Sequence, residues 1–581
     1  MTLLFTLFCP PKKEIITKSN TMSASVPPTS NNLVTPLLTD LYQVTMAYGY
    51  WRSKKHEDHA VFEVFFRKNP FKGSFTIFCG IDEVLSFIAN YNITESDIEY
   101  LKSTPSLQHC EPAFFEYLSK IDCSSVEVQS LQQGTLAQPR EPLIIISGPI
   151  LICQLLETTI LNLVNFPSLL ATNAARLVLA ARGQFGTVNM INGVAPTCVE
   201  YGLRRAQGPD GGLSASKYCI VGGFDGTANV LAGKLYGVPI LGTQAHAFIQ
   251  SYTSLDEVEN LTLKGKVGGG TEVNLFKLVM QKRKDLCQTL RDDAYLKTNM
   301  GELAAFIAYA IAFPSGFLSL VDTYDTIKSG IKNFVMVALT LHDCGYTPVG
   351  IRIDSGDLAS LSLECKKIFQ DLAETLKQPF MNKLKIIASD GINEQKLLDL
   401  NNSGHAISAF GIGTNLVTCQ AQPALGCVYK LVELNGKPRI KLSENTAKNL
   451  IPGKKRSFRL YDEKGMPKMD MLIRSDEKEP QVGKEASCYK PFHNLGGESV
   501  VVKFVPAKVE ELLHVFWNKS KGAQTRVTGL LDAKDSVKKQ IEAIHPDMVV
   551  PKNPMEYSVY ISKGLLDDLN ELLRSNQGKA I

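Results

Sequence analysis

The stretch Val349-Gly-Ile-Arg-Ile-Asp-Ser-Gly-Asp357 has the pattern of a buried strand that ends in polar residues. Side chains alternate between the two faces of a strand, so Arg352 and Asp354 share one face and the two isoleucines share the other. A helix cap explains one polar residue after the strand. It does not explain a charged pair that faces the same way, so we interpret this strand end as part of a ligand site.

The same pattern recurs on both sides of this stretch. Short apolar strands are predicted at 239–242, 384–389 and 407–411, and helical patterns follow at 358–376 and 393–400. Repeated strand–loop–helix units are typical of a parallel sheet. Their number favours a βα barrel, in which ligands bind at the carboxyl ends of the strands.

The two ends of the chain follow a different pattern. Strands and short helices are predicted up to about residue 150. After residue 427 the pattern predicts strands at 428–434, 439–442 and 456–461, with Asn435-Gly436 as a hairpin turn, then helices at 509–517 and 554–573. We therefore expect an α/β fold whose central barrel is wrapped by an α+β domain formed from both chain ends. The expected boundaries are 1–32 for a disordered or targeting tail, 33–150 and 428–575 for the outer domain, and 151–427 for the barrel.

The composition is that of a globular protein with an ordinary surface. Of 581 residues, 44% are hydrophobic and 21% are charged, which excludes a collagen, a coiled coil or a wholly disordered chain. The net charge is only +4, so we expect neither nucleic acid nor an anionic membrane as the main partner. Two apolar runs, 143–170 and 303–321, are interpreted as buried core because proline and glycine interrupt both of them.

The cysteines and the N-terminal residues bear on the compartment. The chain has 13 scattered cysteines and no CxxC pair, which favours reduced thiols and a cytosolic protein. In residues 1–32 the apolar run precedes the lysines, an order that is wrong for a secretory signal. The segment is acid-poor and rich in hydroxyl residues but lacks arginine, so organelle targeting by residues 1–32 stays open as the alternative to a disordered tail.

Other predicted strand ends also carry reactive or polar groups. Asp390-Gly391 follows one strand, and Phe410-Gly-Ile-Gly-Thr-Asn415 ends another with small residues whose backbone amides could bind phosphate or simply form a tight turn. His246 follows the strand at 239–242 and could act as a base, an acid or a phosphoryl acceptor. The segment 200–212 adds an aromatic residue and two arginines. Together these features predict a site for a phosphorylated, polyhydroxylated ligand and a planar anion, and other sugar-phosphate enzymes stay open at this point.

Longer motifs stand in order along the chain: Thr39-Asp-Leu-Tyr-Gln43, Arg204-Arg-Ala-Gln-Gly-Pro-Asp-Gly-Gly212, Gly223-Phe-Asp-Gly-Thr-Ala-Asn229, Gly242-Thr-Gln-Ala-His246, Arg352-Ile-Asp-Ser-Gly-Asp357 and Gly411-Ile-Gly-Thr414. With these motifs the chain closely resembles the nicotinate phosphoribosyltransferase family, from about Leu33 to the C-terminal region. Residues 441–445 and 451–455 add to the resemblance, and residues 1–32 lie outside it.

The resemblance implies a reaction and a fold. The family makes nicotinate mononucleotide and pyrophosphate from nicotinate and 5-phosphoribosyl 1-pyrophosphate (PRPP) in NAD salvage. ATP is a co-substrate, Mg²⁺ is required, and a phosphohistidine couples ATP hydrolysis to synthesis. The implied fold is that of type II phosphoribosyltransferases, an irregular α/β barrel with an open sandwich domain, and a homodimer is expected.

The resemblance also implies residue roles. Those implied as catalytic are the phosphohistidine His246 with Asp354 and Asp390. Those implied for nicotinate are Tyr42 (from a partner subunit), Tyr201, Arg204, Thr243 and Arg352. Those implied for PRPP are Gly411, Gly413 and Thr414. The metal ligands stay unknown, with Asp354 and Asp390 as candidates. Alternatives are a phosphoribosyltransferase for nicotinamide or quinolinate, and a non-catalytic regulator that binds PRPP.

Overall fold

The computed structural model describes residues 31–183, 195–266, 271–441, 450–491, 500–518 and 522–577. The chain clusters into two compact units. The first comprises the residues up to Ala175, Leu213–Gly223 and the residues from Cys419 onward, and the second comprises Arg176–Gly212 and Phe224–Thr418. Residues 1–30 of the predicted tail lie outside the described residues, so the role of this tail stays a prediction.

The first unit is therefore built from both ends of the chain. It also includes residues 151–175, which the sequence pattern assigned to the barrel. The reason is packing, because α5 (Ile150–Leu155) packs against α1 (Leu41–Arg52) and against the strands β1 (His59–Phe65) and β5 (Ile144–Pro149) of this unit.

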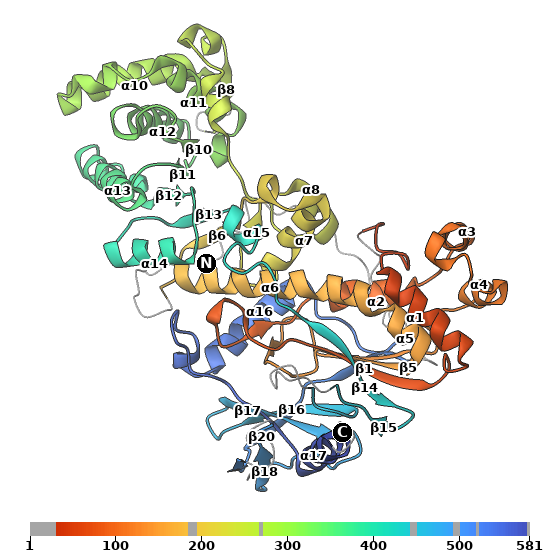
Figure 1. Ribbon diagram of the computed structural model, residues 1–581. Coiled ribbons are helices and arrows are strands. Elements are labelled where there is room, and N and C mark those ends of the chain that lie inside the picture. The colour runs from red at the N-terminus through yellow and green to blue at the C-terminus, as the bar shows by residue number, and fades with distance from the viewer. Residues whose placement is uncertain are drawn as a thin grey trace. The chain divides into compact units, whose positions relative to one another are not determined.

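Two sheets form the frame of the first unit (Figure 1). The larger has the order β15-β14-β1-β5-β3-β21-β22, with β15 at Lys437–Pro438, β14 at Val428–Leu434, β3 at Glu127–Ser130, β21 at His514–Asn518 and β22 at Gly522–Ala523. The smaller has the order β19-β18-β23-β17-β16-β20, with bounds Val501–Phe504, Ala486–Tyr489, Val559–Ile561, Pro467–Arg474, Lys455–Tyr461 and Lys508–Glu511. Asn435 and Gly436 both have positive φ, as the predicted hairpin turn between β14 and β15 requires.

Helices cover these sheets. α17 (Lys563–Gln577) packs its leucines onto Leu472 and Ile561 of the smaller sheet. The unit also contains α2 (Ile81–Ala89), α3 (Glu95–Ser103), α4 (Pro112–Leu118), α16 (Leu530–Ala543) and a short pair of strands, β2 (Thr76–Ile77) and β4 (Leu136–Ala137).

Three local predictions near the C-terminus were wrong. Residues 509–517 form the strands β20 and β21 and not a helix, because β20 pairs with β16 and β21 pairs with β3. The apolar residues of this stretch are partly β-branched and aromatic, which suits a strand once partners are present. Only the second half of 554–573 is helical, since β23 precedes α17. Residues 439–441 are not a strand, and Leu442 lies outside the described residues.

The long helix α6 (Glu157–Ala181) continues through Pro167, which we expected to interrupt this apolar run. Proline cannot donate the hydrogen bond that Leu163 O would accept in a regular helix. Gly80 closely approaches that carbonyl, since a Cβ at residue 80 would lie 2.1 Å from it. Among the described residues, α6 is the one helix long and apolar enough to cross a bilayer, and 83% of its apolar window is buried inside the protein.

Buried charges join the strands of the first unit. Lys455 Nζ lies 2.7 Å from Glu63 and donates to the carbonyls of Ile451 and Gly453. Both side chains are almost completely buried, and burial raises the pKa of Glu63 to about 6 despite the ammonium beside it. This pair joins β1, from the N-terminal half, to β16, from the C-terminal half.

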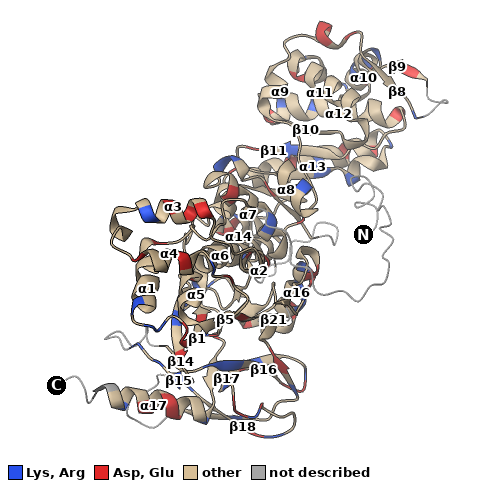
Figure 2. Ribbon diagram, turned by 90° about the vertical axis from the view of Figure 1, so that its right-hand side faces the viewer, with Lys and Arg blue, Asp and Glu red and all other residues tan. Residues whose placement is uncertain are grey.

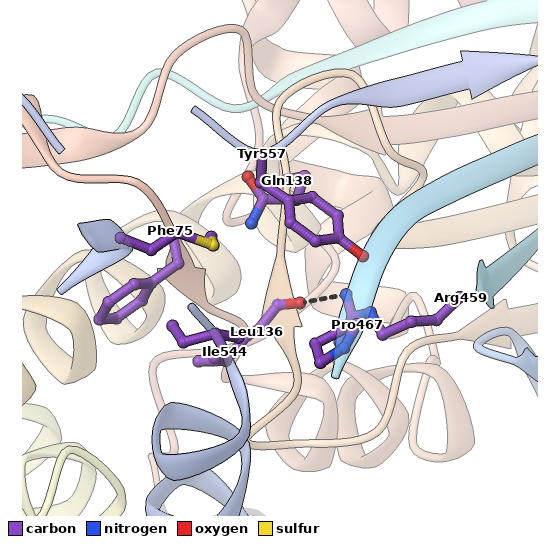
Figure 3. A pocket seen from close by; sticks show the side chains of 8 residues that line it. Phe75, Leu136, Gln138, Arg459, Pro467, Ile544 and Tyr557 are labelled. Atoms are coloured by element: carbon purple, nitrogen blue, oxygen red, sulfur yellow. Dashed lines mark hydrogen bonds between the residues drawn. The ribbon is translucent and has the colours of Figure 1, made fainter. Parts of the chain in front are cut away.

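A second buried ion pair lies beside a small cavity. Arg459 binds Asp470 through two hydrogen bonds of 2.9 and 2.8 Å and donates to Leu136 O. Figure 3 shows the hydrogen bond from Arg459 to Leu136 O at the wall of a cavity of about 10 Å³. Tyr557, Gln138 and Phe75 also line this cavity. That volume holds about one water molecule, and none of the predicted site residues lines it.

The second unit is built on a parallel sheet with the order β10-β11-β12-β13-β6-β7. Its strands are Leu318–Leu320, Gly350–Ile353, Lys385–Ala388, Ala409–Ile412, Thr197–Glu200 and Gly226–Thr227. The predicted strand at 239–242 is present only as a parallel bridge between Ile240 and Thr227. Between the described strands no pairing joins Ile240 to β10, so closure into a barrel stays a prediction.

Helices follow the strands of this sheet and lie alongside it (Figure 1). They are α12 (Ile331–Asp343) after β10, α13 (Leu358–Thr375) after β11, α14 (Glu394–Ser403) after β12 and α8 (Val230–Tyr236) after β7. Asp357 and Asn393 accept hydrogen bonds from the first turns of α13 and α14 and so fix where these helices begin. Acidic and basic residues are interspersed along the described chain (Figure 2).

We expect Lys455→Met to lower the free energy of unfolding by about 3–5 kcal/mol, because Glu63 stays buried without its cation. Urea unfolding measures this change. Adding Glu63→Gln should restore part of the loss, and only part, because the carbonyls of Ile451 and Gly453 still lack their donor. A loss below about 1 kcal/mol in the single variant would contradict the role of this ion pair.

Candidate functional site

Three neighbouring strands of the second unit end at the same level. Arg352 on β11 pairs in register with Leu320 on β10 and with Ile387 on β12. The residues two positions further along these strands are Asp322, Asp354 and Ser389. The parallel register therefore gathers two carboxylates and a hydroxyl at one edge of the sheet, as the sequence pattern predicted for Asp354.

Arg352 is held at this edge by several groups, and its side chain is only 12% exposed. Its Nε donates to Ser389 Oγ at 2.8 Å, and its Nη2 lies 3.1 Å from Asp354 Oδ1. Its Nη1 donates to Thr243 Oγ1 and to Gln244 O, both at 3.3 Å. Ser389 in turn donates to Asp354 Oδ1. The guanidinium therefore has a fixed orientation before any ligand binds.

The aromatic ring of Tyr201 lies beside this guanidinium. The Arg352 carbon Cζ is 5.4 Å from the ring centroid, within the range of a cation–π contact. Burial is the main cause that raises the pKa of Tyr201, so the phenol is neutral at physiological pH. A planar ring and a planar cation thus border the same space.

His246 is the first residue of the short helix α9 (His246–Gln250). Its Nδ1 lies 3.0 Å from Thr323 Oγ1, and its Nε2 faces Asp354 Oδ2 at 3.7 Å and Asp322 Oδ1 at 4.0 Å. The imidazole is 38% exposed. It is therefore oriented through Nδ1 and partly exposed, which suits a nucleophile or a proton carrier.

Asp322 is a site residue that the sequence analysis missed. Its side chain is 2% exposed, and its Oδ2 accepts hydrogen bonds from Asp354 N at 2.8 Å and Ser355 Oγ at 2.6 Å. Its Oδ1 is buried and has no hydrogen-bond partner among the described residues. The signal was present, because Asp322 directly follows the apolar run 303–321, as Asp354 follows its own strand.

Other predicted residues are less tightly held. Asp390 has φ +103°, is about half exposed, and lies 3.6 Å from Lys396 Nζ. Arg204 lies on the 3-10 turn Leu203–Arg205 and is exposed. Thr414 begins the short helix α15 (Thr414–Val417), with Gly413 as its N-cap. Tyr42 belongs to α1 of the first unit and is 48% exposed, and burial and the carboxylates of Glu157 and Asp40 raise its pKa.

Comparison with known proteins places this arrangement in a family. Three family models match the chain: the nicotinate phosphoribosyltransferase N-terminal domain at residues 37–165, the family itself at 332–474 and its C-terminal domain at 454–569. Nicotinate phosphoribosyltransferase 1 of Arabidopsis thaliana is 47% identical over 545 residues, covering 94% of each chain. The chain belongs to the nicotinate phosphoribosyltransferase family. It is an enzyme with nicotinate phosphoribosyltransferase activity in NAD salvage.

Solved structures agree on the fold. The crystal structure of human nicotinic acid phosphoribosyltransferase is 38% identical, covers 92% of this chain and 100% of its own, and has a TM-score of 0.79. The nicotinate-nucleotide pyrophosphorylase from Pyrococcus furiosus is 18% identical, covers 90% of this chain and 99% of its own, and has a TM-score of 0.54, which shows a similar fold. The protein thus has the mixed α/β fold of this family.

Within this nicotinate phosphoribosyltransferase, the packing of Tyr201 depends on a glycine. A Cβ at Gly411 would lie 2.3 and 2.4 Å from two carbon atoms of the Tyr201 ring. The absence of a side chain at residue 411 therefore lets the ring lie against β13. The predicted role of Gly411 in PRPP binding is a separate matter and stays a prediction.

We expect Gly411→Ala to displace the Tyr201 ring and to lower kcat/KM for nicotinate by at least about tenfold, which corresponds to about 1.4 kcal/mol. Steady-state kinetics with nicotinate as the varied substrate measures this effect. Gly49→Ala is the matched control, since a Cβ at residue 49 meets nothing within 4 Å. An unchanged kcat/KM in a folded Gly411→Ala variant would show that the ring position does not matter.

Proposed function

We propose that the enzyme couples ATP hydrolysis to the synthesis of nicotinate mononucleotide and pyrophosphate through a phosphohistidine at His246. The observation that supports this most is a cluster in which Arg352 and Asp354, at the end of β11, lie beside His246 of α9 and Asp322, which follows β10. An oriented cation beside an aromatic ring fits a planar pyridine acid. An accessible imidazole nitrogen beside it fits a phosphoryl acceptor.

Arg352 is the proposed partner of the nicotinate carboxylate. Planar guanidinium groups bind carboxylates through two parallel hydrogen bonds, and the contacts to Ser389, Thr243 and Gln244 already fix its plane. Tyr201 would pack against the pyridine ring, and Thr243 and Arg204 would contact the substrate at its edge. Asp354 balances the Arg352 charge in the absence of substrate, which lowers the cost of holding a cation in a largely buried position.

His246 Nε2 is the proposed phosphoryl acceptor. When Nδ1–H donates to Thr323 Oγ1, Nε2 keeps its lone pair. In the first step Nε2 forms a bond to the γ-phosphorus of ATP, the bond from that phosphorus to the bridging oxygen breaks, and ADP leaves with the electron pair. Water later attacks the phosphorus, the P–N bond breaks, and phosphate is released.

The synthesis step joins nicotinate to the ribose. The pyridine nitrogen forms a bond to C1 of PRPP, and pyrophosphate leaves with the electrons of the C–O bond. The ring nitrogen already carries its lone pair, so the protein has to position the reactants and stabilise charge. Backbone amides at Gly411 and Gly413 and the hydroxyl of Thr414 are proposed to bind PRPP.

Magnesium fits the residues at the strand ends. The described residues contain no cluster of three or more metal-ligating side chains. Mg²⁺ bound with phosphate substrates commonly takes one or two carboxylates from the protein, and Asp354 and Asp390 end the neighbouring strands β11 and β12. These residues would hold the ion, which would neutralise charge on the pyrophosphate.

Further parts of the proposal rest on the family. They are an irregular α/β barrel formed by closure of the parallel sheet, an open sandwich for the outer domain, a homodimer in which Tyr42 of a second copy covers the nicotinate site, and a cytosolic location. The exposure of Tyr42 and the absence of disulfides among the described cysteines are compatible with them.

We expect Arg352→Ala to raise KM for nicotinate by about 10- to 100-fold and to change KM for PRPP much less, because charge-assisted hydrogen bonds to the carboxylate are lost. Initial rates with each substrate varied in turn measure both constants. Arg352→Lys keeps the charge without the planar pair of donors and should fall between the wild type and alanine. Equal losses for both substrates would refute the assignment, and a preference of the wild type for nicotinamide would favour the alternative substrate.

We expect His246→Ala to abolish the stimulation of synthesis by ATP and to raise the PRPP concentration that synthesis requires. ADP and nicotinate mononucleotide quantified in the same reaction measure the coupling. His342→Ala is the matched control, since His342 packs against Phe380 at the end of α12. ATP stimulation that persists in the His246 variant would exclude this residue as the phosphoryl acceptor.

A further inference from the structure

A buried carboxyl group lies on a helix that packs against α9, the helix that begins with His246. Glu302 is on α11 (Met300–Ala312), and its side chain is completely buried. Ser329 Oγ donates to Glu302 Oε2 at 2.6 Å, and Asn333 Nδ2 donates to the same oxygen at 2.9 Å. The other oxygen, Oε1, has no hydrogen-bond partner among the described residues. One oxygen is therefore satisfied twice, and the other is buried alone.

The unpartnered oxygen favours the protonated acid. A buried carboxylate oxygen without a donor is costly, whereas a carboxylic acid can donate through that oxygen. Asn333 Oδ1 and Thr298 Oγ1 are also buried without a partner.

The charges that act on Glu302 also oppose its ionisation. Burial is the largest cause, and the carboxylates of Asp322 and Asp325 add to it, so that the pKa of Glu302 rises to about 7. The hydrogen bonds from Ser329 and Asn333 lower the pKa but do not offset the rise. Asp322 is the same residue whose Oδ1 faces His246 Nε2.

The other elements packed on α11 also carry charged groups. α9 carries His246, and the turn Leu255–Val258 carries Asp256 and Glu257, of which Glu257 accepts hydrogen bonds from Thr253 and Ser254. The buried cation of α10 (Leu275–Leu290), Arg283, donates to the carbonyls of Tyr295 and Leu296. On α12, Lys332 pairs with Asp292. The named contacts of Glu257, Arg283 and Lys332 are thus made with residues other than Glu302.

We propose that Glu302 is a positioning residue that holds a proton behind Asp322 and thereby keeps an additional negative charge away from the phosphoryl-accepting face of His246. This inference rests on the proposed role of His246. ATP and a phosphohistidine both bring anionic oxygens next to Asp322 and Asp354. A neutral Glu302 tolerates them, whereas an ionised Glu302 repels them, and burial weakens the screening of that repulsion by water.

The proposal predicts how ATP stimulation depends on pH. Below pH 7 Glu302 is protonated, and above it the proton passes to solvent and the anion remains. ATP stimulation should therefore fall as pH rises through about 7. Stability follows the same direction, because a carboxyl whose pKa is raised by folding stabilises the protein at low pH and loses that contribution as pH rises through the folded-state pKa.

The test compares the wild type with Glu302→Gln, whose amide has the shape of the acid and cannot ionise. ATP stimulation of nicotinate mononucleotide synthesis is measured from pH 6 to 9 in the full-length enzyme. In the wild type the stimulation should fall several-fold over this range, and in Glu302→Gln it should fall much less. Glu141→Gln is the matched control, since Glu141 is a buried carboxyl of the first unit with a pKa raised to about 8, and this variant should keep the wild-type pH profile.

Two measurements keep the inference testable apart from the role of His246. The carboxyl ¹³C signal that disappears in Glu302→Gln should titrate near pH 7 in the wild type, and the difference in Tm between this variant and the wild type should grow from pH 5 to 8. Ser329→Ala removes a hydrogen bond that favours the Glu302 anion, so it should shift the fall in ATP stimulation to higher pH. This variant replaces Glu302→Gln in the test if Glu302→Gln does not fold. A carboxyl signal that titrates near its ordinary value, or identical pH profiles in wild type and variants, would overturn the inference. If the Glu302 carboxyl titrates near pH 7 but ATP stimulates synthesis in none of the proteins, the buried proton is supported. Only the proposed role of His246 as phosphoryl acceptor is then contradicted.

Discussion

The parallel register of β10, β11 and β12 is the constraint on which the rest of the site depends. Hydrogen bonds between the strands align Leu320, Arg352 and Ile387. Asp322, Asp354 and Ser389 each lie two residues beyond one of these aligned residues. The strand register alone therefore brings the three side chains to the same level of the sheet. A one-residue slip of β11 would turn Arg352 and Asp354 to the opposite face and remove the cation from the site.

The site balances charge at short range. Arg352 compensates Asp354, and Asp354 N and Ser355 compensate one oxygen of Asp322. What remains uncompensated is the other oxygen of Asp322, which faces His246, and one oxygen of Glu302 behind it. Because ATP and PRPP carry several phosphate groups, the proposed proton on Glu302 limits the negative charge that these groups meet in the site.

Much of this arrangement could be predicted from the sequence, because strand ends carry their chemistry in a local pattern. Alternation placed Arg352 and Asp354 on one face, and capping residues located the helices that follow. The same rule would have found Asp322, but an aspartate after a short apolar segment is also an ordinary turn residue. The roles of Tyr42, Arg204 and Thr414 came from the family resemblance alone, and the structure does not test them.

Predictions failed where distant residues decide the local structure. Residues 509–517 have apolar positions that fit either a helix or a strand, and pairing with β16 and β3 selects the strand. Pro167 stays within α6, and Gly80, which is distant in sequence, lies against the Leu163 carbonyl that this proline leaves without its helical donor. Neither partner is visible within the local sequence window.

Residues that match a family motif can bind substrate or can stabilise the fold, and the structure distinguishes these two roles. The segment Ile451-Pro-Gly-Lys-Lys455 contributed to the resemblance as the strand-end motifs did. In the structure Lys455 is buried, and the carbonyls of its own segment and Glu63 of β1 occupy its three donors. No donor remains for a substrate phosphate, so this lysine holds together the two ends of the chain. A basic residue in a family motif is thus evidence for binding only when its donors are accessible.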